Sequence, residues 1–151
     1  MSVIVKERSN VLNVEVSKKA DRRNVKGNDR RNNEISVERG DLIFVDLPEN
    51  ENSSVQGKSR ICIVISNNKA NLHSPVISVI PLTSKMSKRP LPTHVLLEVN
   101  DTNKLRCNSV ALAEQITTVD RKNIKFKTGG RLTDEEMNKV ERAMLIQLGL
   151  M

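Results

Sequence analysis

Aromatic side chains are almost absent from this chain of 151 residues, which contains no Trp, no Tyr and only two Phe. Proteins that grip single-stranded nucleic acids mainly by base stacking rely on several exposed aromatic rings. That mode of recognition is therefore excluded as the main one, and any grip on a nucleic acid must be cationic and polar.

Cysteines and long apolar runs are also scarce. Cys62 and Cys107 are the only cysteines, and neither lies in a Cys-x-x-Cys motif or a Cys/His cluster with metal-ligand spacing. Free thiols are therefore expected rather than a disulfide. No apolar stretch approaches the roughly 18 to 20 residues of a membrane span, and the N-terminus has no apolar signal-peptide core. The sequence predicts a soluble, cytoplasmic protein without a membrane partner.

Positive charge is in excess, because 25 Lys and Arg residues stand against 18 Asp and Glu residues, for a net charge of +7. This balance suits a polyanionic partner such as a nucleic acid or an anionic membrane surface, although solubility alone also explains it. Nine of the basic residues lie in segment 1–36, where few apolar residues follow Val16. We expect a flexible N-terminal extension, either a solvated tail or an aid to nucleic-acid binding. Val11, Val14 and Val16 leave a short strand possible there.

From residue 37 onward, short apolar runs alternate with turn residues, which is typical of an all-β barrel or sandwich. We expect residues 37–151 to form one domain. Its strands are predicted at 42–47, 61–66, 76–82, 93–99, 109–116 and 124–127. Polar loops are expected at 48–59 and 84–92, a turn at 67–75 and a helical turn at 120–123.

The C-terminal segment has the pattern of an amphipathic helix. Thr133 and Glu136 have the spacing of a capping box, in which each side chain satisfies a free backbone amide at the helix start. Met137, Val140, Met144 and Leu148 then fall on one face, which predicts a helix over residues 134–148.

Several short strings, in a fixed order, resemble the MazF/PemK family of toxin–antitoxin ribonucleases. They are Arg39-Gly40-Asp41, Gln56-Gly57-Lys58-Ser59-Arg60, Pro81-Leu82-Thr83, Leu91-Pro92-Thr93-His94-Val95 and Glu114-Gln115-Ile116. The resemblance implies a mainly β, SH3-like barrel with a C-terminal helix. It further implies a homodimer that cleaves single-stranded RNA at specific sequences without a metal or other cofactor. A MazE/PemI-like antitoxin would block the site and bind operator DNA together with the toxin.

The resemblance places the catalytic pair at Arg60 and Thr83, each at the edge of an apolar run beside a polar loop. A guanidinium presents paired donors to phosphate oxygens and stays protonated, so Arg60 is predicted to stabilise charge and to serve as an acid rather than a base. Thr83 would donate its hydroxyl to a phosphate oxygen. The residues expected to contact RNA are Gln56, Lys58, Ser59, Lys85, Lys88, Arg89 and Gln115.

The group that would accept the ribose 2′-OH proton is left open. Histidine is the usual candidate near neutral pH. However, His94 lies in a predicted strand, where a structural or interface role is favoured, and His73 is expected to be exposed. Val55 stands where relatives carry Glu, which removes a possible acid or base, and Ile61 stands where they carry Pro.

Three other interpretations stay open at this point. The first is a barrel of the same fold that binds a protein instead of RNA, as CcdB-type gyrase poisons do. The second is a catalytically impaired family member that binds RNA or operator DNA. The third is a nucleic-acid chaperone that acts through its basic extension.

Overall fold

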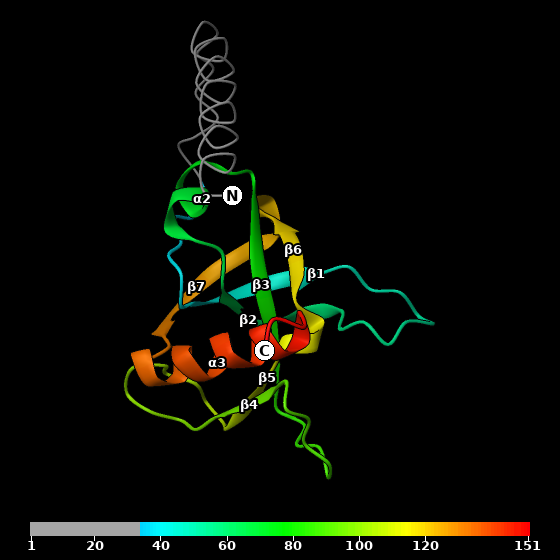
Figure 1. Ribbon diagram of the computed structural model, residues 1–151. Helices are drawn as coiled ribbons and strands as arrows, with labels where there is room; N and C mark the ends of the chain where they lie inside the picture. Colours follow the sequence, from blue (N-terminus) through cyan, green and yellow to red (C-terminus); the bar gives the residue numbers. More distant parts are fainter. Residues whose placement is uncertain (1–33) are drawn as a thin grey trace, which may run out of the picture. The chain divides into compact units, whose positions relative to one another are not determined.

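The computed structural model describes residues 34–151, so the expectations for residues 1–33, including the short strand and the flexible extension, lie outside it. The boundary proposed at residue 37 stays a prediction. The described elements, shown in Figure 1, are β1 (Asp41–Leu47), β2 (Lys58–Val64), α2 (Asn68–His73), β3 (Val76–Thr83), β4 (His94–Leu97), β5 (Ser109–Leu112), η1 (Ala113–Gln115), β6 (Thr117–Asp120), η2 (Arg121–Asn123), β7 (Ile124–Arg131) and α3 (Asp134–Gln147). Within residues 34–151, no helix has the length and apolar character that a membrane crossing requires.

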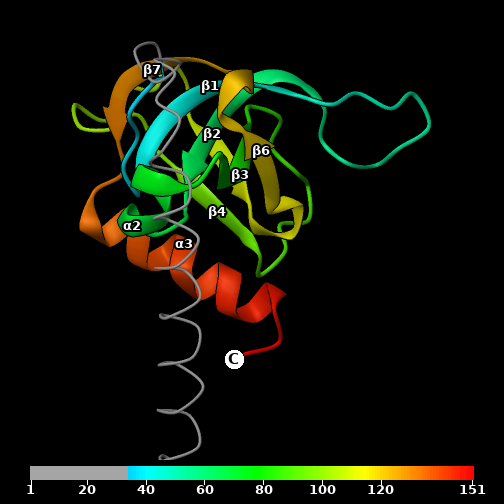
Figure 2. The ribbon, with the colours of Figure 1, turned by 90° about the horizontal axis from the view of Figure 1, so that it is seen from above.

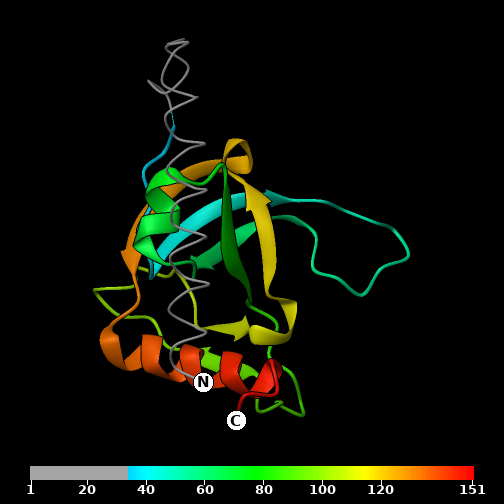
Figure 3. The same ribbon diagram turned by 45° about the horizontal axis from the view of Figure 1, so that its top comes forward.

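The strands form one antiparallel sheet with the order β4-β5-β3-β2-β1-β7, and β6 pairs with β3 outside this path. Strand β3 changes partner along its length: its first residues pair with β6, and Leu82 and Thr83 pair with β5. The sheet therefore bends around β3, as Figure 3 shows, and α3 crosses one end of it. The prediction of a mainly β protein with a C-terminal helix is confirmed.

Alternation along the strands divides the apolar side chains between two cores. Leu42 of β1 and Ile63 of β2 face a cluster that includes Val140 and Ala143 of α3. Their neighbour Ile43 faces a second cluster, on the other side of the sheet. Successive side chains of a strand point to opposite faces, so the central strands read as continuous apolar runs because both faces are covered.

The capping box at the start of α3 is present as predicted. Thr133 accepts a hydrogen bond from the Glu136 amide, and the Glu136 side chain accepts one from the Thr133 amide. The predicted apolar face needs one correction, because Leu148 is 58% exposed and follows the last helical turn, whereas Ala143 is buried. Leu148 is therefore not part of the core.

Two local predictions were wrong. The predicted turn at 67–75 contains helix α2, which Asn67 caps by accepting a hydrogen bond from the Ala70 amide. The predicted strand 109–116 ends at Leu112 and continues as the 3-10 turn η1, so Gln115 does not lie on a strand. The helical turn near Asn123 is confirmed, and β7 is longer than expected.

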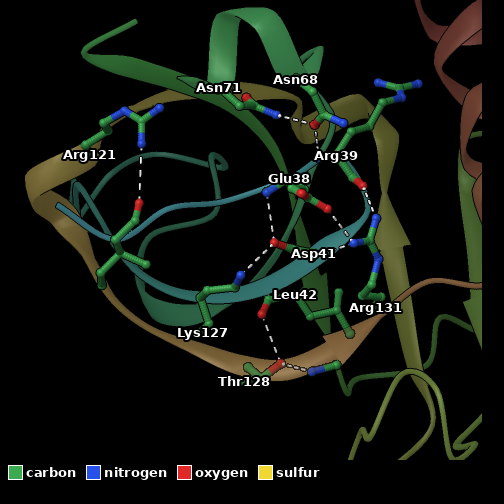
Figure 4. A network of polar contacts seen from close by, with 12 residues as sticks. Glu38, Arg39, Asp41, Leu42, Asn68, Asn71, Arg121, Lys127, Thr128 and Arg131 are labelled. Atoms are coloured by element: carbon green, nitrogen blue, oxygen red, sulfur yellow. Dashed lines mark hydrogen bonds and ion pairs between the residues drawn. The ribbon is translucent and has the colours of Figure 1, made fainter. Parts of the chain in front are cut away.

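A polar network fixes the start of β1 against the end of β7 (Figure 4). The Asp41 carboxylate, which is buried, accepts a hydrogen bond from the Glu38 amide at 2.8 Å and pairs with Lys127 at 3.2 Å and Arg131 at 3.6 Å. Arg131 also donates to the Arg39 carbonyl at 3.0 Å. The charges compensate one another, so the Arg39-Gly40-Asp41 string has a structural role here.

A second network centres on Asn103, whose side chain is completely buried in the loop between β4 and β5. Its Nδ2 donates to the Glu98 carbonyl at 2.8 Å and to Glu136 at 2.9 Å. Its Oδ1 accepts from the Asn100 and Leu105 amides, both at 3.1 Å. The network ties this loop to the first turn of α3.

We expect Asn103→Ala to lower the free energy of unfolding by about 2–4 kcal/mol, because it leaves several buried backbone groups without partners. Urea denaturation of the purified protein measures this. Asn138→Ala, at an exposed position of α3, is the matched control and should change stability by less than about 0.5 kcal/mol. Equal effects of the two substitutions would contradict the role of the network.

Candidate active site

Arg60 lies near the start of β2 and is partly buried. Its Nε donates to the Gly57 carbonyl at 2.9 Å. Its Nη1 donates to the Gln56 side chain and, at 3.5 Å, to the carbonyl of Leu82. Leu82 directly precedes Thr83, so these contacts place the guanidinium between the β1–β2 loop and the end of β3.

Gln56 and Gly57 belong to the long loop that joins β1 to β2 and projects from the sheet (Figure 2). The loop closes tightly at its base, since a Cβ atom on Gly57 would lie 2.9 Å from the Pro48 carbonyl oxygen. The backbone N–H of Gln56 donates a hydrogen bond to the side-chain oxygen of Gln115 at 3.1 Å. The side-chain nitrogen of Gln115 donates to the Ser54 carbonyl at 3.3 Å. Gln115 of η1 thereby holds the loop.

A cavity of about 340 Å³ lies beside this arrangement. It is lined by Gln56, Thr83, Lys85, Met86, Ser87, His94, Val110, Leu112, Glu114 and Gln115. The Thr83 hydroxyl oxygen accepts a hydrogen bond from the Lys85 amide at 3.2 Å, so its O–H remains able to donate. Of the residues predicted from the sequence, Thr83, Gln56, Lys85 and Gln115 meet at the cavity, and Arg60 reaches its edge through Gln56.

An acidic group, which the sequence did not assign, also lines the cavity. The Glu114 carboxylate lies 2.7 Å from His94 Nε2 and accepts a hydrogen bond from the Thr93 hydroxyl at 3.0 Å. His94 Nδ1 accepts from the Leu91 amide at 3.2 Å, so the proton of the neutral ring is on Nε2 and points at Glu114. Both ring nitrogens are engaged, which supports the structural role expected for His94.

Glu114 is thus oriented by two neighbours but remains partly exposed, with 25% of its side chain accessible. Each carboxylate oxygen has a second lone pair that can accept a further proton or hydrogen bond. The resemblance had included the strings that contain Thr93, His94 and Glu114, but gave Glu114 no role. Only the contacts that Thr93 and His94 make with Glu114 in the structure mark this carboxylate as a candidate proton acceptor.

The structure separates some predicted residues from this cluster. Ser59 donates to the Asp46 carboxylate on the face of β2 opposite to Arg60. Hydrogen bonds from Lys125 and then Ser59 lower the pKa of Asp46. Lys58 is exposed and pairs with Glu49 at 3.5 Å.

The remaining basic residues and the nearby thiol complete the surroundings of the site. Lys88 and Arg89 are exposed in the β3–β4 loop and do not line the cavity. Burial raises the pKa of the Cys62 thiol to about 12, although the Arg60 charge acts in the opposite direction. Cys62 is therefore a protonated core residue rather than a nucleophile. Both cysteines are free, as expected.

Comparison with known proteins decides the family. Residues 38–148 match the model of the PemK-like, MazF-like toxins of type II toxin–antitoxin systems. The chain belongs to this family. The MazF-like chain is also a homologue of the endoribonuclease MazF of Staphylococcus saprophyticus, with 38% identity over 114 residues, which are 76% of this chain and 92% of the relative.

Solved structures agree with the fold of this MazF-like chain. MazF from Deinococcus radiodurans has a TM-score of 0.65 at 19% identity, over 76% of this chain and 98% of that one. A mycobacterial endoribonuclease in complex with its cognate antitoxin has a TM-score of 0.61 at 24% identity, over 76% and 97% of the two chains. At these identities the likeness supports the fold alone.

Proposed function

We propose that this chain is a toxin that cleaves single-stranded RNA by attack of a ribose 2′-OH on the neighbouring phosphorus, without a metal. The observation that carries the proposal is a cavity lined by Thr83 and the carboxylate of Glu114, with the guanidinium of Arg60 beside it, bonded to the lining residue Gln56 and to the Leu82 carbonyl. The proposal agrees with the name of the 38% identical relative, the endoribonuclease MazF. Cleavage of messenger RNA would inhibit translation and growth.

The three side chains divide the chemistry among them. Glu114 accepts the 2′-OH proton as the 2′-oxygen bonds to phosphorus. The hydroxyl of Thr83 donates a hydrogen bond to a non-bridging phosphate oxygen. Arg60 donates to the oxygens on which negative charge builds in the transition state. The bond from phosphorus to the 5′-oxygen then breaks, and that oxygen takes a proton from Arg60 or from solvent. The products are a 2′,3′-cyclic phosphate and a 5′-hydroxyl.

RNA is drawn to the site by the charge around it. Lys85 lies at the cavity, and Lys88 and Arg89 are exposed in the same loop. Lysine and arginine contacts to phosphates raise affinity for RNA without selecting its sequence. Selection of particular bases therefore depends on the polar groups of the β1–β2 and β3–β4 loops.

The decisive experiment incubates the full chain with a long single-stranded RNA in EDTA and maps the new ends. We expect discrete fragments with 2′,3′-cyclic phosphate and 5′-hydroxyl ends at a common short sequence. The Arg60→Ala protein, purified in the same way, controls for contaminating ribonucleases. RNA that stays intact at high protein excess would reject the proposal and favour a family member that only binds its target.

The partners of the toxin follow from the same proposal. The structural neighbours include a mycobacterial endoribonuclease solved with its cognate antitoxin and MazE–MazF structures from D. radiodurans. We propose a MazE/PemI-like antitoxin that covers the cavity and carries the toxin to operator DNA.

A homodimer is supported by apolar side chains around a groove of about 1090 Å³ between β4 and α3. Leu96 and Val99 both line the groove, and they are 52% and 48% exposed. Burial of such side chains favours association. Light scattering should report twice the chain mass of 17.0 kDa.

A further inference from the structure

The side chain of Gln115 lines the cavity and binds the β1–β2 loop through both its amide oxygen and its amide nitrogen. Its Oε1 accepts a hydrogen bond from the Gln56 amide at 3.1 Å, and its Nε2 donates to the Ser54 carbonyl at 3.3 Å. Residues 49–55 of this loop are all exposed. Few apolar contacts therefore hold the loop, and hydrogen bonds from outside it have a large share in fixing its position.

The part of the loop that Gln115 holds is also the part that orients Arg60. The Gln56 side chain accepts from Arg60 Nη1, and the Gly57 carbonyl accepts from Arg60 Nε at 2.9 Å. Within residues 34–151, Nη2 has no hydrogen-bond partner. The loop thus decides which edge of the guanidinium is offered to a phosphate.

Gln115 itself stands on a well-anchored turn. The Ala113 amide of η1 donates to the Thr93 carbonyl at 3.0 Å, and Ile116 packs against the core that contains α3. The neighbouring Glu114 is tied to Thr93 and His94. The same turn therefore carries the carboxylate and the anchor of the loop, which fixes Glu114 and Arg60 relative to one another.

We propose that Gln115 is a positioning residue that acts on Arg60 through Gln56, and that it does not read the RNA. The proposal rests on the endoribonuclease function argued above and gives Gln115 a different role from the RNA contact predicted from the sequence. Bidentate reading of a base edge needs both the amide oxygen and the amide nitrogen. Both groups of Gln115 are already directed at the loop backbone.

The first test needs no RNA. Gln115→Ala should speed hydrogen exchange of the Gln56 amide by about tenfold in the full chain, because that amide loses its acceptor. Gln147→Ala removes the same side chain from an exposed position of α3 and should leave exchange in the loop unchanged. If Gln115→Ala also left loop exchange unchanged, the anchoring role would be refuted.

The second test separates positioning from RNA contact by steady-state kinetics. Gln115→Ala should lower kcat by about tenfold with KM changed less than about twofold, because a misplaced catalytic group slows the chemical step. In a Gln56→Ala background, the same substitution should cost less than about threefold, since one of the two contacts between the loop and Arg60 is already lost and the loop holds the guanidinium only through the Gly57 carbonyl. The cleavage sequence should not change.

A rise in KM or a new base preference, with kcat kept, would overturn the proposal and make Gln115 an RNA contact. Failure of the proposed function looks different. If the parent chain cleaves no RNA, the hydrogen-exchange experiment still shows whether Gln115 anchors the loop.

Discussion

Arg60→Ala is expected to lower kcat/KM for RNA cleavage by about 10²–10³-fold, which is the usual cost of removing one preorganised donor to a developing oxyanion. The fold should survive, because among residues 34–151 the Arg60 side chain bonds only to the loop and to the Leu82 carbonyl. Cleavage of a defined RNA under single-turnover conditions measures the effect, and circular dichroism checks the fold.

Two further variants sharpen this test. Arg60→Lys keeps the charge but loses the planar fork, so it should restore only part of the activity. Arg106→Ala removes an exposed arginine from the β4–β5 loop, away from the cavity lining, and should keep full activity. If Arg60→Ala cleaved RNA within a few-fold of the parent, Arg60 would not be the phosphate-binding group. In cells, the same substitution should abolish growth arrest on induction.

Glu114→Gln is expected to lower kcat by about 10²–10⁴-fold, which is the usual contribution of a positioned general base. Gln has the same shape and still accepts a hydrogen bond from Thr93 or His94, but it cannot take the 2′-OH proton. The rate constant of the chemical step at saturating protein measures the loss. Affinity for an uncleavable RNA with a 2′-deoxyribose at the scissile position should change little.

Glu135→Gln is the matched control for this substitution. Glu135 is exposed on α3, pairs with Lys139 and lies at the groove between β4 and α3 rather than at the cavity, so its loss should not affect the chemical step. If Glu114→Gln kept the parental rate, the proton would have to go to solvent or to a phosphate oxygen. If it lost stability together with activity, Glu114 would be a structural partner of His94 instead.

The assignment of Glu114 bears on the departure at Val55. The resemblance to the family led us to expect Glu at this position, and its replacement suggested from the sequence that a carboxylate was missing. Val55 is 66% exposed, whereas Glu114 lines the cavity. The site therefore keeps a carboxylate, supplied from η1 rather than from the loop.

The sequence by itself determined the local elements and the family. Short apolar runs bounded by turn residues located β1 and β3, because a strand buried on both faces leaves that pattern in its own residues. The helix start at Thr133 followed from a spacing of three residues. Arg60 and Thr83 came from short strings that resemble the family; Thr83 lines the cavity, and Arg60 bonds to the carbonyl of the preceding Leu82 and to the lining residue Gln56.

Tertiary structure decided what lies far apart in the chain. Glu114 meets Thr93 and His94 where the start of β4 lies beside the end of its neighbour β5, and Gln115 reaches a loop about sixty residues away in sequence. Such pairs depend on strand register and on the 3-10 turn that replaces the predicted end of β5. The side chains of Ser59 and Arg60 likewise lie apart, because they point to opposite faces of β2. No local pattern encodes these meetings, since they follow from how the strands pair, and this pairing places Glu114 where we propose that it accepts the 2′-OH proton.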